Sequence, residues 1–138
     1  MQTKIIFIEG VDRVGKGSLM QAIHKATNYK HIIFDRGVIS NMVYSIVHNR
    51  LTPELYVEYS NIEEEIAKTN HVVLHLTCST DVLKERMVKT GHEYIDFDGH
   101  KQLFESFCGT SPLNVVTLDT TTQSPEVLAG ILKGAGII

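Results

Sequence analysis

The residues best placed to do chemistry form the segment GVDRVGK near the start of the sequence. Two glycines, Gly10 and Gly15, bracket four residues, and Lys16 follows them. This spacing is typical of a loop whose backbone N–H groups converge on phosphate oxygens at a helix N-terminus, with the lysine adding positive charge near the outer phosphates. The segment therefore predicts a nucleotide-binding loop, whose contacting residues we expect to be Gly10, Asp12, Arg13, Val14, Gly15, Lys16, Gly17 and Ser18.

The position after Lys16 departs from the usual phosphate loop. Gly17 stands where a Ser or Thr hydroxyl usually contacts Mg²⁺, and Ser18 comes one residue later. Two arrangements would preserve the metal: Ser18 reaches it directly or through water, or water, phosphates and a carboxylate from another strand carry most of the coordination. Adenylate kinases resemble this sequence here, because their loops also read Gly-Lys-Gly-Thr. Magnesium therefore stays an expected cofactor, with Ser18 as a candidate ligand.

A carboxylate and an arginine follow the next apolar segment, HIIFDRG. In a parallel sheet, ligands bind beyond the carboxyl ends of the strands, and Asp35 and Arg36 stand at such an end. We expect Asp35 to be the carboxylate on the magnesium side. The guanidinium of Arg36 can grip a phosphate through two parallel hydrogen bonds. The alternative is an ordinary surface Asp–Arg pair, but the neighbouring phosphate loop favours a functional role.

Alternating apolar and helical patterns would position these residues. Short apolar runs predict strands over residues 4–8, 31–35, 71–77 and 114–119. Helical spacing and helix-start signals such as Thr52–Pro53 and Ser124–Pro125 predict helices over 16–27, 40–50, 52–70, 79–91, 98–107 and 124–134. Strands separated by helices pair in parallel through crossovers, so the expected fold class is α/β. We expect a three-layer P-loop NTPase fold, with a short, mostly parallel sheet of about four strands flanked by helices.

Composition and charge narrow the class of protein. The 138 residues, 43% hydrophobic and 21% charged, suffice for one domain with a sizeable core but not for two. The net charge of −3 argues against binding to a nucleic-acid backbone, which requires a basic surface. The two cysteines form no CxxC pair, and the apolar run at residues 5–8 is too short for a signal peptide or a membrane span. We expect a cytoplasmic protein with a single domain over residues 1–138, no stable nucleic-acid binding and no membrane association.

Two segments resemble the sequence motifs of thymidylate kinases. The loop FIEGVDRVGKGSL follows the family pattern Glu-Gly-x-Asp-x-x-Gly-Lys-Ser-Thr up to the lysine, and FDRGVISNMVY is similar to a second motif, Asp-Arg followed by Ser and then Tyr. Residues 72–95 are similar to a strand, helix and lid of the family, and residues 114–132 to its last strand and helix, whose connecting loop borders the adenine. The matching motif residues are Glu9, Gly10, Asp12, Gly15, Lys16, Asp35, Arg36, Ser40 and Tyr44.

The resemblance implies phosphoryl transfer from ATP, with Mg²⁺, to a nucleoside monophosphate, and dTMP is the leading acceptor. On the donor side, Lys16 would hold the phosphates and Asp35 would hold magnesium. Arg13 matches the members that carry a catalytic arginine in the loop, where it would offset charge on the transferring phosphoryl group. The family also suggests a homodimer.

On the acceptor side, the resemblance gives Arg36 the role of binding the monophosphate. Asp12 would accept a hydrogen bond from the acceptor's sugar hydroxyl, and Ser40 and Tyr44 would border the acceptor. Arg86 would act from a small lid around residues 86–97 that closes over the phosphates. The alternative for Arg86 is favourable charge at a helix C-terminus.

The main departure from the family concerns the acceptor. Only residues 27–34 fill the interval in which thymidylate kinases carry a strand, helices and a Phe-x-Arg-Glu-Pro segment that helps hold the thymine. Two alternatives stay open. One is a deoxynucleoside or polynucleotide 5′-hydroxyl kinase, which would need a general base, whereas Arg36 favours an anionic acceptor. The other is a nucleotide-binding module with little catalysis, against which Arg13 and the Asp35–Arg36 pair argue.

Overall fold

The strands form one parallel sheet. The computed structural model describes residues 2–11, 14–90 and 97–138. Its four strands pair in the order β2-β1-β3-β4, and every pairing is parallel. The strands are β1 (Ile5–Glu9), β2 (Ile32–Asp35), β3 (His71–Thr77) and β4 (Val115–Asp119).

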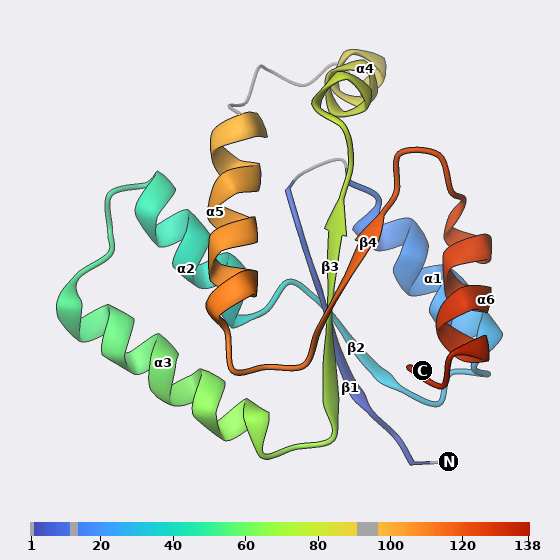
Figure 1. The fold of residues 1–138 in the computed structure, drawn as a ribbon, viewed down its shortest axis with the longest axis horizontal. Coiled ribbons are helices and arrows are strands. Elements are labelled where there is room, and N and C mark those ends of the chain that lie inside the picture. The colour runs from blue at the N-terminus through green and yellow to red at the C-terminus, as the bar shows by residue number, and fades with distance from the viewer. Residues whose placement is uncertain (1, 12–13, 91–96) are drawn as a thin grey trace.

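Helices cover both faces of this sheet, which confirms the predicted three-layer α/β fold (Figure 1). One layer holds α1 (Lys16–Ala26) and α6 (Pro125–Gly134), which pack against each other. The other layer holds α2 (Val38–Val47), α3 (Pro53–Ala67) and α5 (Phe97–Thr110), with α2 in contact with both α3 and α5. The remaining helix, α4 (Thr80–Thr90), lies beyond the carboxyl end of β3, at the edge of the sheet where the phosphate loop also lies (Figure 1).

The core lies around β1 and β3, the two inner strands. β3 is buried from His71 to Leu76, as expected for a strand that helices cover on both faces. In β1, Ile6 and Ile8 are fully buried while Phe7 is only half-buried, so the strand alternates between a deep and a shallower side. This alternation also decides which side chains share a face near the carboxyl ends of the strands.

The second strand is apolar in sequence but more exposed than the two inner strands. Ile32 is 52% and Phe34 is 49% exposed. The reason is topological, since β2 is an edge strand with a neighbour on one side only. Phe34 recovers part of its contact by stacking on Phe7, with 5.4 Å between the ring centroids. Arg36, which directly follows β2, therefore lies at an open edge of the sheet.

Helix boundaries agree with the sequence where caps mark them. Thr52 accepts a hydrogen bond from the N–H of Leu55, and Ser124 accepts one from Val127, so both predicted N-caps are confirmed. Three helices differ most from the expected bounds. α2 begins directly after Gly37, two residues earlier than predicted, and ends three residues earlier. α3 also ends three residues earlier than predicted, and α5 runs over 14 residues rather than the expected ten.

Two further expectations concern the interior and the membrane. Cys78 and Cys108 are both buried free thiols, and burial raises the pKa of Cys108 to about 12, so this thiol is unreactive. Within residues 2–11, 14–90 and 97–138, every helix falls short of the length or the apolar character that crossing a bilayer demands.

Candidate active site

The loop between β1 and α1 has the strand-to-helix setting that the sequence predicts. Gly10 has a φ of 149°, and a Cβ there would lie 2.6 Å from the carbonyl oxygen of Leu76, so only glycine fits this turn. Gly15 is the N-cap of α1, and glycine offers no side chain to bond the first N–H groups of the helix. Those N–H groups are the donors that a phosphate would meet.

Lys16 lies over this loop rather than in solvent. Its side chain is 8% exposed, and Nζ donates hydrogen bonds to the carbonyl oxygens of Gly10 at 3.1 Å and Val11 at 2.9 Å. The loop backbone thus holds the ammonium close to the N–H groups at the start of α1. The position of Lys16 in the loop agrees with the sequence prediction, while its role toward a phosphate stays a prediction.

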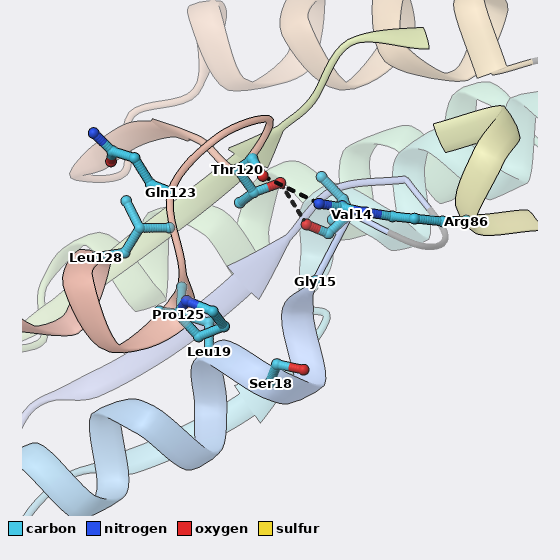
Figure 2. A pocket seen from close by; sticks show the side chains of 9 residues that line it. All are labelled: Val14, Gly15, Ser18, Leu19, Arg86, Thr120, Gln123, Pro125 and Leu128. Atoms are coloured by element: carbon cyan, nitrogen blue, oxygen red, sulfur yellow. Dashed lines mark hydrogen bonds between the residues drawn. The ribbon is translucent and has the colours of Figure 1, made fainter. Parts of the chain in front are cut away.

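A cavity of about 390 Å³ opens on one side of the loop, between α1, α4 and the segment before α6 (Figure 2). Leu19, Pro125 and Leu128 give it apolar walls, while Ser18 and Arg86 bring polar groups. Apolar walls with a few polar groups are typical of sites for organic ligands. We call this cavity the donor-side cavity, and its lining residues are Val14, Gly15, Ser18, Leu19, Arg86, Thr120, Gln123, Pro125 and Leu128.

Thr120 ties together three segments around the donor-side cavity. Its buried hydroxyl donates to the carbonyl oxygen of Val14 at 2.7 Å and to that of Thr77 at 3.3 Å. Arg86 in turn donates from Nη2 to the carbonyl oxygen of Thr120 at 3.1 Å, and Figure 2 shows its side chain reaching from α4 toward that residue. Thr120 was not predicted from the sequence, although it directly follows β4 at the carboxyl edge of the sheet, the same signal that identified Asp35.

The two predicted magnesium ligands lie on the same side of the sheet. Asp35 pairs in register with Ile8 and therefore shares its face, opposite to Glu9, which bonds to α2. That face carries α1, whose first turn holds Ser18 (Figure 1). Both side chains are exposed and offer the hard oxygen atoms that Mg²⁺ prefers. They fit a magnesium ion that is held mainly by phosphates and water.

On the other side of the loop, the structure brings Arg36, Ser40 and Tyr44 together. Nη1 of Arg36 donates to the hydroxyl of Tyr44 at 3.2 Å and to that of Ser40 at 3.5 Å. The same nitrogen donates to the carbonyl oxygen of Gly10 at 3.3 Å. The guanidinium carbon also lies 4.9 Å from the centre of the Tyr44 ring. Three of the four predicted acceptor residues thus form one cluster that touches the loop between β1 and α1, and the fourth, Asp12, lies outside the described residues.

A second cavity, of about 210 Å³, extends from this cluster along α2 to α3. We call it the acceptor-side cavity. It adds Arg50, His48 and Tyr59 to the predicted residues, and the His48 ring stacks on Tyr44 at 6.2 Å. The sequence analysis missed these three because no motif marks them. They lie beyond the second motif and become neighbours only when α3 folds back beside α2.

The last residue of β1 is a buried carboxylate whose role the sequence analysis also missed. Glu9 is 1% exposed and accepts hydrogen bonds from the N–H of Gly37 and the N–H of Ser40, each at 3.0 Å, and from the Ser40 hydroxyl. Burial raises its pKa, while the hydrogen bonds from Ser40 and Gly37 and the charge of Arg36 oppose that rise. Glu9 therefore connects the residue before the phosphate loop to the start of α2.

Some predicted residues lie outside the described part of the chain. These are Asp12 and Arg13 in the loop and residues 91–96 of the expected lid, so their roles stay predictions. Gly17 is described and exposed, and a Cβ there would meet no described atom within 4 Å. Lack of space therefore does not explain why glycine stands where a hydroxyl residue is usual.

No protein family model matches the chain. The SPbeta prophage-derived protein YorR of Bacillus subtilis (strain 168) is 27% identical over 118 residues, which span 83% of this chain and 71% of YorR.

Two solved structures share the fold. YorR from Bacillus subtilis, in a complex with phosphorylated GDP, matches with a TM-score of 0.78 and 21% identity, covering 97% of this chain and 96% of YorR. Thymidylate kinase from Candida albicans matches with a TM-score of 0.58 and 15% identity, covering 98% of this chain and 93% of the kinase. Likeness at these identities shows the fold alone. The chain therefore has a P-loop fold of the thymidylate kinase type.

Proposed function

We propose that this protein is an ATP- and Mg²⁺-dependent nucleoside monophosphate kinase, with dTMP as the leading acceptor. One observation carries the proposal: the carbonyl oxygen of Gly10 accepts hydrogen bonds from both Lys16 Nζ at 3.1 Å and Arg36 Nη1 at 3.3 Å. The cation that would hold the donor phosphates and the cation that would hold the acceptor phosphate thus meet at one atom. Phosphoryl transfer depends mainly on such positioning and on charge stabilisation.

The donor side has the features that a nucleoside triphosphate needs. The N–H groups at the start of α1 and Lys16 would bind the β- and γ-phosphates, and the donor-side cavity would take the base and ribose. Arg86 lines this cavity, where it would contact the phosphates of a bound nucleotide. Magnesium would neutralise developing negative charge, and Ser18 and Asp35 would hold it together with phosphates and water. Arg13, by resemblance, would add charge at the transferring group.

The acceptor side favours an anion over a neutral hydroxyl. Arg36 and Arg50 both line the acceptor-side cavity, and His48 lies between them in sequence. Two guanidinium groups in a small cavity suit a monophosphate, whereas a hydroxyl acceptor would need a general base instead. The rings of Tyr44 and Tyr59 offer surfaces for a sugar or a base.

A guanine nucleotide is a second candidate for the acceptor. YorR, which shares 27% identity with this chain, is solved with phosphorylated GDP. The link between α1 and β2 is only residues 27–31, so this chain lacks the segment that reads thymine in the resembled family. The base is therefore the open part of the proposal, and guanosine monophosphates belong beside dTMP in the test.

The experiment is a coupled ADP-release assay with ATP and Mg²⁺ across nucleoside monophosphates, nucleosides and a 5′-hydroxyl oligonucleotide. We expect turnover with at least one monophosphate and none with nucleosides. Turnover with nucleosides or the oligonucleotide alone would move the assignment to a hydroxyl kinase. If nucleotides bind but no acceptor is turned over, the protein is a binding module and the proposal is wrong.

Sedimentation at working concentration tests the homodimer that the resemblance suggests.

A further inference from the structure

Glu9 joins two parts of the site that are far apart in sequence. Its backbone continues into Gly10 of the phosphate loop, while its carboxylate accepts the N–H groups of Gly37 and Ser40 at the start of α2. Gly37 is the N-cap of α2 and, as a glycine, has no side chain to bond those groups. A carboxylate at a helix N-terminus supplies both the hydrogen bonds and the favourable charge. Glu9 thus replaces a local cap with one from a neighbouring strand.

The turn that Glu9 holds has little freedom. Arg36 has a φ of 77°, in the left-handed region that non-glycine residues seldom adopt, and its N–H donates to the carbonyl oxygen of Ile8 at 2.9 Å. A Cβ on Gly37 would lie 2.7 Å from Cδ1 of Phe7, so a side chain does not fit there. Three consecutive residues of β1 therefore contact the turn. Phe7 does so through its ring, Ile8 through its carbonyl oxygen and Glu9 through its carboxylate.

The arrangement of this turn decides where the Arg36 side chain goes. Its Nη1 reaches the carbonyl oxygen of Gly10 and the Ser40 hydroxyl, and that hydroxyl itself donates to Glu9. A chain of hydrogen bonds thus runs from the guanidinium through Ser40 to Glu9. Any loosening at Glu9 would shift both the backbone of Arg36 and the hydroxyl that its side chain contacts.

We propose that Glu9 is a positioning residue that aims Arg36 at the acceptor phosphate. The acceptor role of Arg36 rests on the proposed kinase function, while the aiming itself rests on the contacts above. Glu9 does not touch substrate, because it is 1% exposed and both of its oxygens are occupied by donors from α2. It acts only through the residues that it holds.

The test is Glu9→Gln, which keeps shape and volume but turns one acceptor oxygen into a donor. That amide must then face an N–H of Gly37 or Ser40, so one contact is lost. We expect the acceptor KM to rise about tenfold, as for a lost hydrogen bond to a charged group, while the KM for ATP changes less than about twofold. The matched control is Glu63→Gln, because Glu63 is also buried and accepts from a serine hydroxyl, Ser111, at 2.6 Å. The control should leave both KM values unchanged.

The double variant separates aiming from a general structural role. In the Arg36→Ala background, Glu9→Gln should raise the acceptor KM no further, because the residue through which it acts is gone. An additive rise would overturn the inference, as would an unchanged acceptor KM in the single variant. Should Glu9→Gln fail to fold, Glu9→Asp keeps the carboxylate but shortens its reach to the N–H groups of Gly37 and Ser40, and it should raise the acceptor KM about threefold without changing the KM for ATP.

Hydrogen exchange provides a readout that does not depend on turnover. The amides of Gly37 and Ser40 should exchange faster in Glu9→Gln than in wild type, while amides in the middle of α1 keep their protection. If no acceptor is turned over but these amides exchange faster, the kinase function is wrong and the holding role of Glu9 stands. Unchanged exchange at both amides would overturn the role of Glu9, whatever the activity.

Discussion

The two sides of the phosphate loop are built differently. The donor-side cavity, about 390 Å³, has apolar walls and lies where α1, α4 and the segment before α6 meet, with Thr120 bonded to three other segments. The acceptor-side cavity, about 210 Å³, is lined mainly by polar and charged side chains and lies near the exposed edge strand β2. If the proposed function holds, the donor would bind in a cavity formed by packing, whereas the acceptor would depend on a few charged contacts.

Lys16 contacts the loop that lies between the two cavities, so its removal should have the largest effect. Lys16→Ala deletes the ammonium that contacts Gly10 and Val11 and would face the donor phosphates. We expect kcat to fall by about a hundredfold to a thousandfold, as when one donor to developing charge is removed. Steady-state kinetics with saturating monophosphate measures this. A loss confined to the KM for ATP would show that the lysine only binds the donor.

Arg36→Ala should break the acceptor side and spare the donor side. Loss of a guanidinium that can bind phosphate through two hydrogen bonds should raise the acceptor KM by about thirtyfold to a hundredfold. The affinity for ATP, measured by calorimetry without acceptor, should stay within about twofold. Arg36→Lys is the control, because it keeps the charge but loses the planar fork, and it should recover only part of the loss. Equal losses on both sides would contradict the separation of the two cavities.

Thr120 gives the reverse test on the donor side. Thr120→Val keeps the shape but removes the hydroxyl that bonds to Val14 and Thr77. We expect the KM for ATP to rise about threefold to tenfold with the acceptor KM unchanged, since the carbonyl group of Val14 loses a donor while that of Thr77 keeps the backbone N–H of Thr120. Thr120→Ser keeps the hydroxyl and should stay near wild type. A larger change in the acceptor KM than in the KM for ATP would contradict the assignment of Thr120 to the donor-side cavity.

The smallest expected effect is a pH dependence of stability that comes from Glu9. Burial raises its pKa in the folded state above the value of 4.5. The folded state therefore holds the proton more tightly than the unfolded state, so the stability from this group is complete below pH 4.5 and is lost as pH rises through the folded pKa. Denaturant unfolding of wild type and Glu9→Gln across this range should show the free-energy difference shifting against wild type as pH rises. A shift in favour of wild type would contradict the sign of the pKa change.

The fold followed from the sequence because local signals agreed with one another. Apolar runs predicted the four described strands. Thr52 and Ser124 marked two helix starts, because an N-cap hydroxyl bonds to an N–H only three residues further along the chain. The exposure of Phe34 could not be read in this way, since it depends on β2 having one neighbour instead of two. Strand order is a property of the whole chain.

The residues of the candidate site also fall into those that motifs revealed and those that were missed. Lys16, Arg36 and Tyr44 were found from motifs, and the structure places Lys16 in the loop and brings Arg36 and Tyr44 into contact. Arg50 was missed because no motif marks it, whereas Thr120 follows β4 at the carboxyl edge of the sheet and could have been found by the signal that identified Asp35. Glu9 was seen as part of a motif, but its role depends on contacts 28 and 31 residues away, which no local pattern reveals.

The most direct measurement of the central claim follows the γ-phosphoryl group itself. ATP labelled at that group is incubated with Mg²⁺, the protein and a panel of monophosphates that includes dTMP and GMP. The account predicts that label appears in a nucleoside diphosphate, and that the yield at subsaturating monophosphate falls strongly in Arg36→Ala but not in the matched control Glu63→Gln. Label that stays in ATP, or that appears only as inorganic phosphate with every acceptor, would contradict it.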